Sequence, residues 1–436
     1  MTATAIILAS GLGTRMKSAL PKPLHKIAGR PMLNQLMAAC EAVFDRIVVV
    51  IGPEIDPALI APHQVAFQHN RLGTAHAALQ AEALFGDAGE VAVLYADNPL
   101  ISVDTLRRLL ARRAEGDVSL ALLAMRPPDA GRYGRVLTRG DYVTSIVEWV
   151  DADREERAVG LCNAGVLCGD AADMRRWLKA VRPDNSKGEY YLTDLVTLAV
   201  ADGLKVGAVE APFEELRGIN SRAELAQAEA AVQQRMRVAA MEAGVTLTAP
   251  DTVFFSHDTK LAADVTVEPN VVFACGVTVE TGAEIRSFSH LEGCHVGAGA
   301  VIGPYARLRP ATKVGAGAHV GNFVELKATL LGAGAKANHL SYLGDASIGA
   351  GTNVGAGTIT CNFDGFSKHR TAVGKNAFIG TGTVLVAPVA VGDGGFTAAG
   401  SVITRNVPAD AMAFARARQV ELPGKAAAFR AARTKK

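Results

Sequence analysis

The sequence has no excess of charge of either sign. Its 45 Lys and Arg residues nearly balance 43 Asp and Glu residues, and the formal net charge is +2. This balance argues against a nucleic-acid-binding protein, which requires clustered positive charge. One basic cluster lies at the C-terminal end and consists of Arg430, Arg433, Lys435 and Lys436. We interpret it as a solvated terminus, with a phosphate-binding arm as the less favoured alternative.

Paired cysteines and long apolar runs are also missing. No two of the six cysteines have the two-residue gap of a zinc or redox motif. The six are Cys40, Cys162, Cys168, Cys275, Cys294 and Cys361. Reduced thiols in a reducing compartment are therefore expected. The apolar run at Ala5–Ala9 is far too short for a signal peptide, and no stretch approaches a membrane span. We expect a cytoplasmic protein.

The second half of the chain has a six-residue period. Its runs are Val296, Ile302, Leu308, Val314, Val320 and Leu326; Val373, Ile379, Leu385, Val391, Thr397 and Ile403; and Val267, Phe273, Val279, Ile285 and Leu291. A period of six fits neither a helix nor a flat strand. It predicts a left-handed parallel β-helix of hexapeptide repeats, in which each hexad forms one face of a triangular coil and its apolar residue points inward. Cys361–Arg370 interrupts the phase and predicts an inserted functional loop.

The first half alternates strand-like and helix-like segments. Strands are predicted at Ala5–Ala9, Ile47–Ile51 and Val91–Ala96, and helices at Pro31–Phe44 and Gly73–Leu84. This alternation predicts an α/β, Rossmann-like domain with a mostly parallel sheet covered by helices on both faces. Ligands of such sheets lie beyond the carboxyl ends of the strands, so Gly11–Arg15 and Asp97 are expected near one another.

One long segment without Gly or Pro separates the two halves. Arg222–Met241 is rich in Ala, Glu, Gln and Arg, and it predicts a single connecting helix. The predicted organisation is a first domain at residues 1–221, a linker helix at 222–243 and a β-helix domain at 244–436.

A glycine-rich turn after the first strand predicts a phosphate site. Leu8–Met16 contains Gly-x-Gly-Thr-Arg, and Pro-Lys-Pro follows at 21–23. Such a turn lets backbone N–H groups approach phosphate, and Arg15 and Lys22 can neutralise charge that develops on phosphorus. The third glycine of a dinucleotide fingerprint and the Gly-Lys-Ser/Thr of a Walker loop are both missing. Asp97 is interpreted as a magnesium ligand in preference to a turn former.

A second group of polar residues stands among the Gly, Ala and Val of the hexad region. His339 is the candidate general base, because neutral imidazole can accept a proton from an attacking amine near pH 7. Arg309, Lys327 and Tyr342 suit a phosphate monoester. Glu325 shares a strand face with Lys327 and is a candidate for orienting His339.

These motifs resemble a known family. The Leu8–Met16 turn, Lys22 and Asp97 resemble those of sugar-nucleotide pyrophosphorylases. With the hexad half included, the chain to about Arg416 resembles the bacterial bifunctional N-acetylglucosamine-1-phosphate uridylyltransferases / glucosamine-1-phosphate N-acetyltransferases. The resemblance implies N-acetylation of glucosamine-1-phosphate by acetyl-CoA. Uridylyl transfer from UTP then releases pyrophosphate.

The resemblance also implies cofactors, partners and a place in metabolism. The product, UDP-N-acetylglucosamine, supplies peptidoglycan and lipopolysaccharide synthesis. Mg²⁺ is the implied cofactor, and acetyl-CoA and UTP are the co-substrates. The implied assembly is a homotrimer through the β-helix, with active sites between subunits, and no nucleic-acid or membrane partner is implied.

The resemblance assigns residues to both sites. For the nucleotide and sugar it implies Leu8, Ala9, Ser10, Gly11, Lys22, Gln68, Gly73, Thr74, Tyr95, Ala96, Asp97, Gly134, Glu148, Asn163 and Asn220, with Asp97 and Asn220 as the metal ligands. For the sugar phosphate in the β-helix it implies Arg309, Lys327, Tyr342, Asn353 and Lys368. For acetyl-CoA it implies Ala356, Asn362, Phe363, Thr381, Ala399 and Arg416.

Three residues depart from the family's pattern. Phe363 replaces the usual Tyr and loses a hydroxyl, although its ring can still pack on a ligand. Thr381 replaces a common Ser and keeps a hydroxyl, and Ala96 stands where Gly is frequent. The expected acetyl transfer is direct, with His339 taking a proton from the amine that attacks the thioester. Cys361 is the rival nucleophile, and we favour a structural role for it.

Two other functions fit parts of the pattern. One is a single-activity pyrophosphorylase whose hexad half only mediates oligomerisation or regulation. His339 with Arg309 and Lys327 argues against it, because a passive coil does not need them. The other is a non-catalytic subunit of a eukaryotic translation-factor exchange complex, which needs no intact phosphate site.

Overall fold

The computed structural model of the protein describes residues 2–434. The chain divides into two compact units, Met1–Val232 and Gln233–Lys436. Helix α8 (Arg222–Glu242) runs across the division, where the sequence predicts one continuous helix. Arg430 and Arg433 of the basic cluster are exposed, and Lys435 and Lys436 lie outside the described residues. In residues 2–434, no helix is long and apolar enough to cross a membrane.

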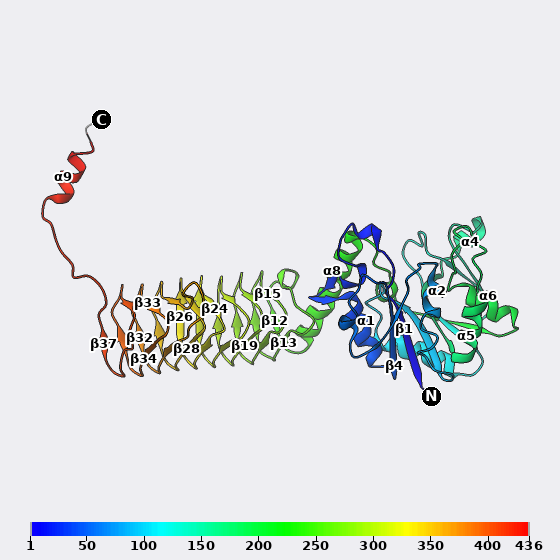
Figure 1. The fold of residues 1–436 in the computed structure, drawn as a ribbon, viewed down its shortest axis with the longest axis horizontal. Helices are drawn as coiled ribbons and strands as arrows, with labels where there is room; N and C mark the ends of the chain where they lie inside the picture. Colours follow the sequence, from blue (N-terminus) through cyan, green and yellow to red (C-terminus); the bar gives the residue numbers. More distant parts are fainter. Residues whose placement is uncertain (1, 435–436) are drawn as a thin grey trace. The chain divides into compact units, whose positions relative to one another are not determined.

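The first unit is built on a nine-stranded sheet (Figure 1). Its strands are β1 (Ala3–Leu8), β4 (Arg46–Ile51), β5 (Gln64–Phe67), β6 (Glu90–Tyr95), β7 (Leu120–Met125), β8 (Arg135–Arg139), β9 (Tyr142–Val147), β10 (Cys162–Asp170) and β11 (Val206–Glu210), in the order β5-β4-β1-β6-β10-β7-β11-β9-β8. A separate pair is β2 (Lys26–Ile27) and β3 (Arg30–Pro31).

Helices accompany this sheet. They are α1 (Met32–Glu41), α2 (Thr74–Leu79), α3 (Val103–Ala114), α4 (Arg154–Ala158), α5 (Ala171–Ala180), α6 (Asp194–Ala201) and α7 (Phe213–Leu216), with 3-10 turns η1 (Thr14–Met16), η2 (Lys22–Leu24) and η3 (Pro57–Ile60). Alternate residues of β1 enter two different cores, Ala5 and Ile7 in one and Ile6 and Leu8 in the other. Both faces of the sheet are therefore buried, which explains the continuous apolar runs of its strands.

Two sequence expectations for this unit need correction. Only β5-β4-β1-β6 and the pair β7–β11 are parallel, whereas β10 lies antiparallel to β6 and β7, so the sheet is mixed and not mostly parallel. The predicted helices are also too long. Helix α1 begins after Pro31, which lies in β3 with extended backbone, and α2 ends at Leu79 and is followed by turns.

The second unit is a parallel β-helix, preceded by the 3-10 turn η4 (Pro250–Thr252). Its first sheet contains β12 (Thr246–Leu247), β14 (Thr266–Val267), β17 (Glu284–Ile285), β20 (Val301–Ile302), β23 (His319–Asn322), β26 (Lys336–His339), β29 (Asn353–Val354), β32 (Phe378–Ile379), β35 (Phe396–Thr397) and β37 (Met412–Ala413). The second contains β13 (Lys260–Leu261), β16 (Thr278–Val279), β19 (Cys294–Val296), β22 (Thr312–Val314), β25 (Leu330–Leu331), β28 (Ala346–Ile348), β31 (Thr371–Val373) and β34 (Val389–Val391). The third contains β15 (Val272–Phe273), β18 (His290–Leu291), β21 (Arg307–Leu308), β24 (Glu325–Lys327), β27 (Tyr342–Gly344), β30 (Ile359–Cys361), β33 (Val384–Val386) and β36 (Val402–Ile403). Helix α9 (Lys425–Ala431) follows the coils and is exposed throughout.

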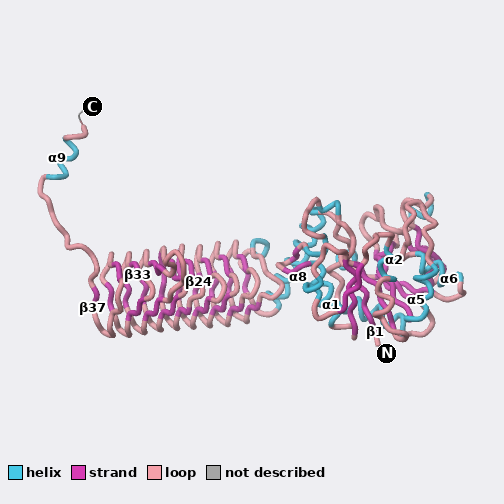
Figure 2. The backbone as a smooth tube through the Cα atoms, viewed as in Figure 1, coloured by secondary structure: helices cyan, strands magenta, loops and turns pink. Residues whose placement is uncertain are grey.

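The register of these sheets confirms the predicted hexad coil (Figure 2). Each strand pairs in parallel with one 17 or 18 residues later, as in Leu308 with Leu326 and Val301 with His319, which is one turn of three hexads. All the predicted inward residues are buried, and nearly all join one continuous core. The exception to the spacing is Ala346, which pairs with Thr371, 25 residues away. The extra residues form the loop that the broken phase predicts.

Candidate functional sites

A pocket of about 400 Å³ lies beyond the carboxyl ends of β1, β5 and β6. It is lined by eleven of the predicted nucleotide residues, namely Leu8, Ala9, Ser10, Gly11, Lys22, Gln68, Gly73, Thr74, Tyr95, Ala96 and Asp97, and also by Leu12, Pro23, Arg71, Ala77 and Glu189. The position agrees with the rule that parallel sheets bind ligands at the carboxyl ends of their strands.

Polar contacts hold the glycine-rich turn against the strand β5. The Ser10 hydroxyl donates to the Gln68 side chain, which in turn donates 3.1 Å to the Gly73 carbonyl. Arg71 donates from Nε to the Ser10 carbonyl at 2.6 Å and binds both carboxylate oxygens of Glu54. Arg71 was not a predicted site residue. Its signal in the sequence is its position between Gln68 and Gly73, two residues that the resemblance selects.

One cation already lies between the two predicted metal ligands. The Lys22 ammonium contacts the Asp97 carboxylate and donates 3.1 Å to Asn220 Oδ1. The Ile219 N–H donates 2.9 Å to the Asp97 carbonyl, which brings the distant Asn220 segment to the end of β6. Lys22, Asp97 and Asn220 are therefore brought together. Arg15 is not, because it lies exposed in η1 and does not line the pocket.

The predicted sugar residues gather on a neighbouring part of the same unit. The Asn163 N–H donates 2.9 Å to the Gly134 carbonyl, and a Cβ on Gly134 would lie 3.4 Å from the Glu148 carboxylate. Glu148 lines a second pocket with Asp151, Asn185, Tyr191 and others. Burial raises the pKa of Glu148. It also raises the pKa of the Tyr95 phenol, which lies near both Asp97 and Glu148 and links the two pockets.

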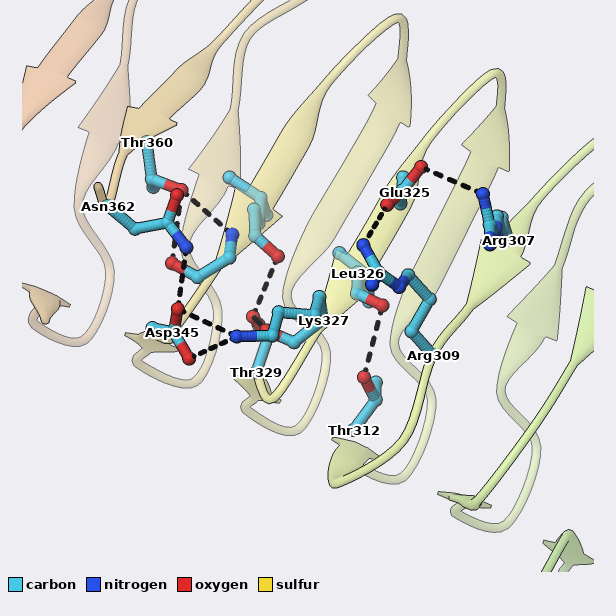
Figure 3. A network of polar contacts seen from close by, with 12 residues as sticks. Arg307, Arg309, Thr312, Glu325, Leu326, Lys327, Thr329, Asp345, Thr360 and Asn362 are labelled. Carbon is cyan, nitrogen blue, oxygen red and sulfur yellow. Dashed lines mark hydrogen bonds and ion pairs between the residues drawn. The ribbon is translucent and has the colours of Figure 1, made fainter. Parts of the chain in front are cut away.

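In the β-helix, charged side chains of successive coils form a network on the third sheet (Figure 3). Arg309 donates 2.9 Å to Glu325 on the next coil. Lys327 lies 2.9 Å from both oxygens of Asp345, and Asn362 donates to Asp345 at 2.6 Å. Asp345 was not predicted, although it follows Lys327 by the 18 residues of one coil.

Lys368 reaches this network from the inserted loop. Hydrogen bonding to Asp345 raises the pKa of Lys327, whereas the close approach of Lys327 lowers the pKa of Lys368. Two ammonium groups side by side repel one another, and an anion between them would relieve that repulsion. Tyr342 lies on β27 of the same sheet, while Asn353 lies on β29 of the first sheet. Phe363 bridges to Lys368 through the backbone and is 59% exposed.

The orientation of His339 differs from the expectation. Its Nδ1 lies 2.9 Å from Asn322 Oδ1, one coil earlier on the first sheet, whereas Glu325 is bound by Arg309 on the third sheet. Glu325 therefore does not orient the imidazole, and Asn322 does. With Nδ1 donating to Asn322, Nε2 is left as the proton acceptor. His339 and Asn322 line a shallow pocket of about 200 Å³, separated from Tyr342 by the corner Leu340–Ser341.

Four predicted acetyl-CoA residues form a column along that corner. The Gly357 N–H donates to the His339 carbonyl at 3.3 Å, Gly382 to Ala356 at 2.7 Å and Gly400 to Thr381 at 2.8 Å. The Arg416 guanidinium then donates 3.0 Å to the Ala399 carbonyl. Ala356, Thr381, Ala399 and Arg416 thus follow His339 one coil at a time.

The same corner changes character at His339. Gly357, Gly382 and Gly400 have left-handed backbone with φ near 70°, and they leave the corner open. Towards the N-terminus the equivalent residues are Phe288, Tyr305, Phe323 and Leu340, also with positive φ, and they are 47–62% exposed. The three rings stack with centroids 4.8 and 5.3 Å apart. We call these four residues the apolar ladder.

Comparison with known proteins agrees with both halves. Residues 5–160 match the sequence profile of the MobA-like NTP transferase domain, and residues 293–328 match that of the bacterial transferase hexapeptide, six repeats. Proteins named bifunctional protein GlmU are similar over almost the whole chain. The one from Gluconacetobacter diazotrophicus is 64% identical over 100% of this chain and 95% of its own, and the one from Acidiphilium cryptum is 62% identical over 99% of each. The chain therefore belongs to the family of bifunctional GlmU proteins.

Proposed function

We propose that the two reactions of this family take place at two separate sites of the chain. Uridylyl transfer is assigned to the pocket beyond β1 and β6, and acetyl transfer to the corner beside His339. The observation that carries the assignment is the convergence of eleven predicted nucleotide residues, from five separate segments, on one pocket.

The chemistry follows from the family. The chain is a bifunctional enzyme that makes UDP-N-acetylglucosamine. It acetylates the amine of glucosamine-1-phosphate with acetyl-CoA and then joins N-acetylglucosamine-1-phosphate to the uridylyl group of UTP, releasing pyrophosphate. The product is a precursor of cell-wall polymers.

At the uridylyl site, the chain's residues position the phosphates and neutralise charge. Backbone N–H groups of the glycine-rich turn and the Lys22 ammonium face the pocket where the α-phosphate is attacked in line by the sugar-phosphate oxygen. Asp97 and Asn220 fit Mg²⁺, because both offer oxygen ligands and one cation, Lys22, already reaches both. When bound, the ion would neutralise charge on the phosphates. The exposed Arg15 is assigned to the leaving pyrophosphate.

At the acetyl site, His339 acts as the general base. Asn322 holds Nδ1, so Nε2 takes the proton from the sugar amine as the amine attacks the thioester carbon. Lys327 and Lys368 bind the phosphate of the sugar, and the open glycine corner receives the coenzyme arm beside Ala356, Thr381 and Ala399. Collapse of the tetrahedral oxyanion expels the CoA thiolate. No cysteine takes part, since Cys361 is not needed for direct transfer.

We further propose a homotrimer in the cytoplasm. The apolar ladder supports the trimer, because four large side chains exposed along one edge of a β-helix favour contact with another copy. The substrates support the compartment, since UTP and acetyl-CoA are intracellular metabolites.

The first experiment follows both products in one reaction. The full-length protein is mixed with Mg²⁺, glucosamine-1-phosphate, acetyl-CoA and UTP, and free thiol and pyrophosphate are measured separately. We expect both, with pyrophosphate release dependent on acetyl-CoA. Pyrophosphate from N-acetylglucosamine-1-phosphate without any thiol release would make the β-helix a scaffold and would overturn the role of His339.

A further inference from the structure

A cluster of three potential metal ligands lies at the first coil of the β-helix, outside both sites. A ring nitrogen of His257, a carboxylate oxygen of Asp258 and the sulfur of Cys275 all lie within 4.8 Å of one another. His257 and Asp258 stand in the turn before β13, and Cys275 follows β15 on the next coil. The cluster therefore joins two successive coils at one corner.

The geometry of Asp258 supplies an independent observation. Asp258 Oδ2 accepts a 2.8 Å hydrogen bond from the Gly276 N–H, next to Cys275. Asp258 Oδ1 is buried and has no hydrogen-bond partner in residues 2–434. A buried carboxylate oxygen without a partner costs about 1–3 kcal/mol, or more because it is charged. A bound cation would remove that cost.

The donor set identifies the class of ion. One thiolate, one imidazole and one carboxylate suit a borderline-soft divalent metal, whereas Mg²⁺ and Ca²⁺ prefer oxygen ligands alone. Zinc bonds to these atoms are about 2.0–2.3 Å long, so ligand atoms of one ion lie roughly 3.5 Å apart. Side-chain rotation on an exposed corner can close the remaining distance. We propose that His257, Asp258 and Cys275 bind a zinc-type ion, with water completing the tetrahedron.

The accessibility of Cys275 agrees with this assignment. Cys40, Cys162, Cys168 and Cys294 are buried, and burial raises the pKa of each thiol, so they are poor metal ligands. Cys275 is exposed at the corner. The ion would tie the Ser256–Thr259 turn to the second coil, near the end of the β-helix that α8 covers through Arg237 and the Val253 carbonyl, 2.9 Å apart.

Zinc binding to the intact protein tests the proposal. The full-length protein is stripped with chelator and titrated with Zn²⁺, and with Co²⁺ as a spectroscopic probe of thiolate ligation. We expect one tight ion whose affinity falls at least ~10-fold in Cys275→Ser, His257→Gln and Asp258→Asn. Asp258→Asn keeps an acceptor for the Gly276 N–H, so it separates loss of charge from loss of fold.

Matched controls and a second readout make the result decisive. Cys361→Ser and His295→Gln change a thiol and an imidazole elsewhere in the β-helix, and both are expected to bind zinc as the unmodified protein does. Zinc should also slow alkylation of Cys275 in the unmodified protein but not in His257→Gln. Equal zinc affinity in the unmodified protein and Cys275→Ser, or Co²⁺ binding without a thiolate signal, would overturn the proposal.

Discussion

Asn322 is the side chain that holds the proposed base, through a 2.9 Å contact with His339 Nδ1. Removing it leaves the imidazole free to rotate and to carry its proton on either nitrogen. We expect Asn322→Ala to lower kcat for acetyl transfer by about 10–100-fold, within the ~10²–10⁴-fold loss expected for His339→Ala. Uridylyl transfer should be unchanged.

The pH profile of Asn322→Ala separates positioning from a structural role. In the variant, the acid limb of the kcat profile for acetyl transfer should shift, since the imidazole loses its hydrogen-bond acceptor. Asn322→Asp keeps an acceptor and should restore most of the activity. An unchanged pH profile and full activity in Asn322→Ala would refute the assignment.

Asp97 is expected to be essential for one reaction only. Asp97→Ala removes a proposed metal ligand and the partner of Lys22, so uridylyl transfer should fall below detection at saturating Mg²⁺. Acetyl transfer should remain, because its residues lie in the second unit. Separate thiol and pyrophosphate assays check this, with Glu54→Ala as a surface carboxylate control. Loss of both activities in a folded variant would count against two independent sites.

The corner of the β-helix makes a prediction for a whole structural element. A Cβ on Gly400 would meet nothing within 4 Å, and Phe323 shows that the same corner accepts a phenyl ring at positive φ. Gly400→Phe should therefore cost only about 1–2 kcal/mol of backbone strain while it fills the proposed coenzyme groove. We expect the KM for acetyl-CoA to rise at least ~10-fold.

A glycine on a different corner provides the control for this variant. Gly317 also has positive φ and open space around its Cβ position, but it lies between β22 and β23, on another corner of the coil. Gly317→Phe carries the same strain and should leave the KM for acetyl-CoA unchanged. Equal effects of the two substitutions would show that strain, and not coenzyme contact, is responsible.

The assembly of the whole molecule is tested on the apolar ladder. We expect the unmodified protein to run as a trimer, three times the 45.5 kDa chain, in light scattering. Phe323→Asp places a charge in the proposed interface and should shift the protein towards monomer. Acetyl transfer should then fall while uridylyl transfer persists. A monomeric unmodified protein, or a trimeric variant, would place the interface elsewhere.

Much of the fold could be predicted because its determinants are local and periodic. Each inward residue of the β-helix recurs every six positions, so the coil, its core and the interrupting loop could all be deduced from spacing. The glycine-rich turn and Asp97 could be placed together because parallel strands bring their carboxyl ends to one edge. The antiparallel β10 could not, because strand direction depends on how the chain crosses the sheet and not on its apolar pattern.

Contacts between distant segments depended on the three-dimensional arrangement. The pairing of His339 with Asn322 and of Lys327 with Asp345 follows from stacking of coils 17 or 18 residues apart, and the choice among neighbouring polar residues is made by which sheet each one faces. Asn220 reaches Lys22 across almost two hundred residues, because the end of β6 is where both segments return. Spacing alone therefore determines which residues point inward, while side-chain geometry around a closed coil or sheet edge determines which polar groups meet.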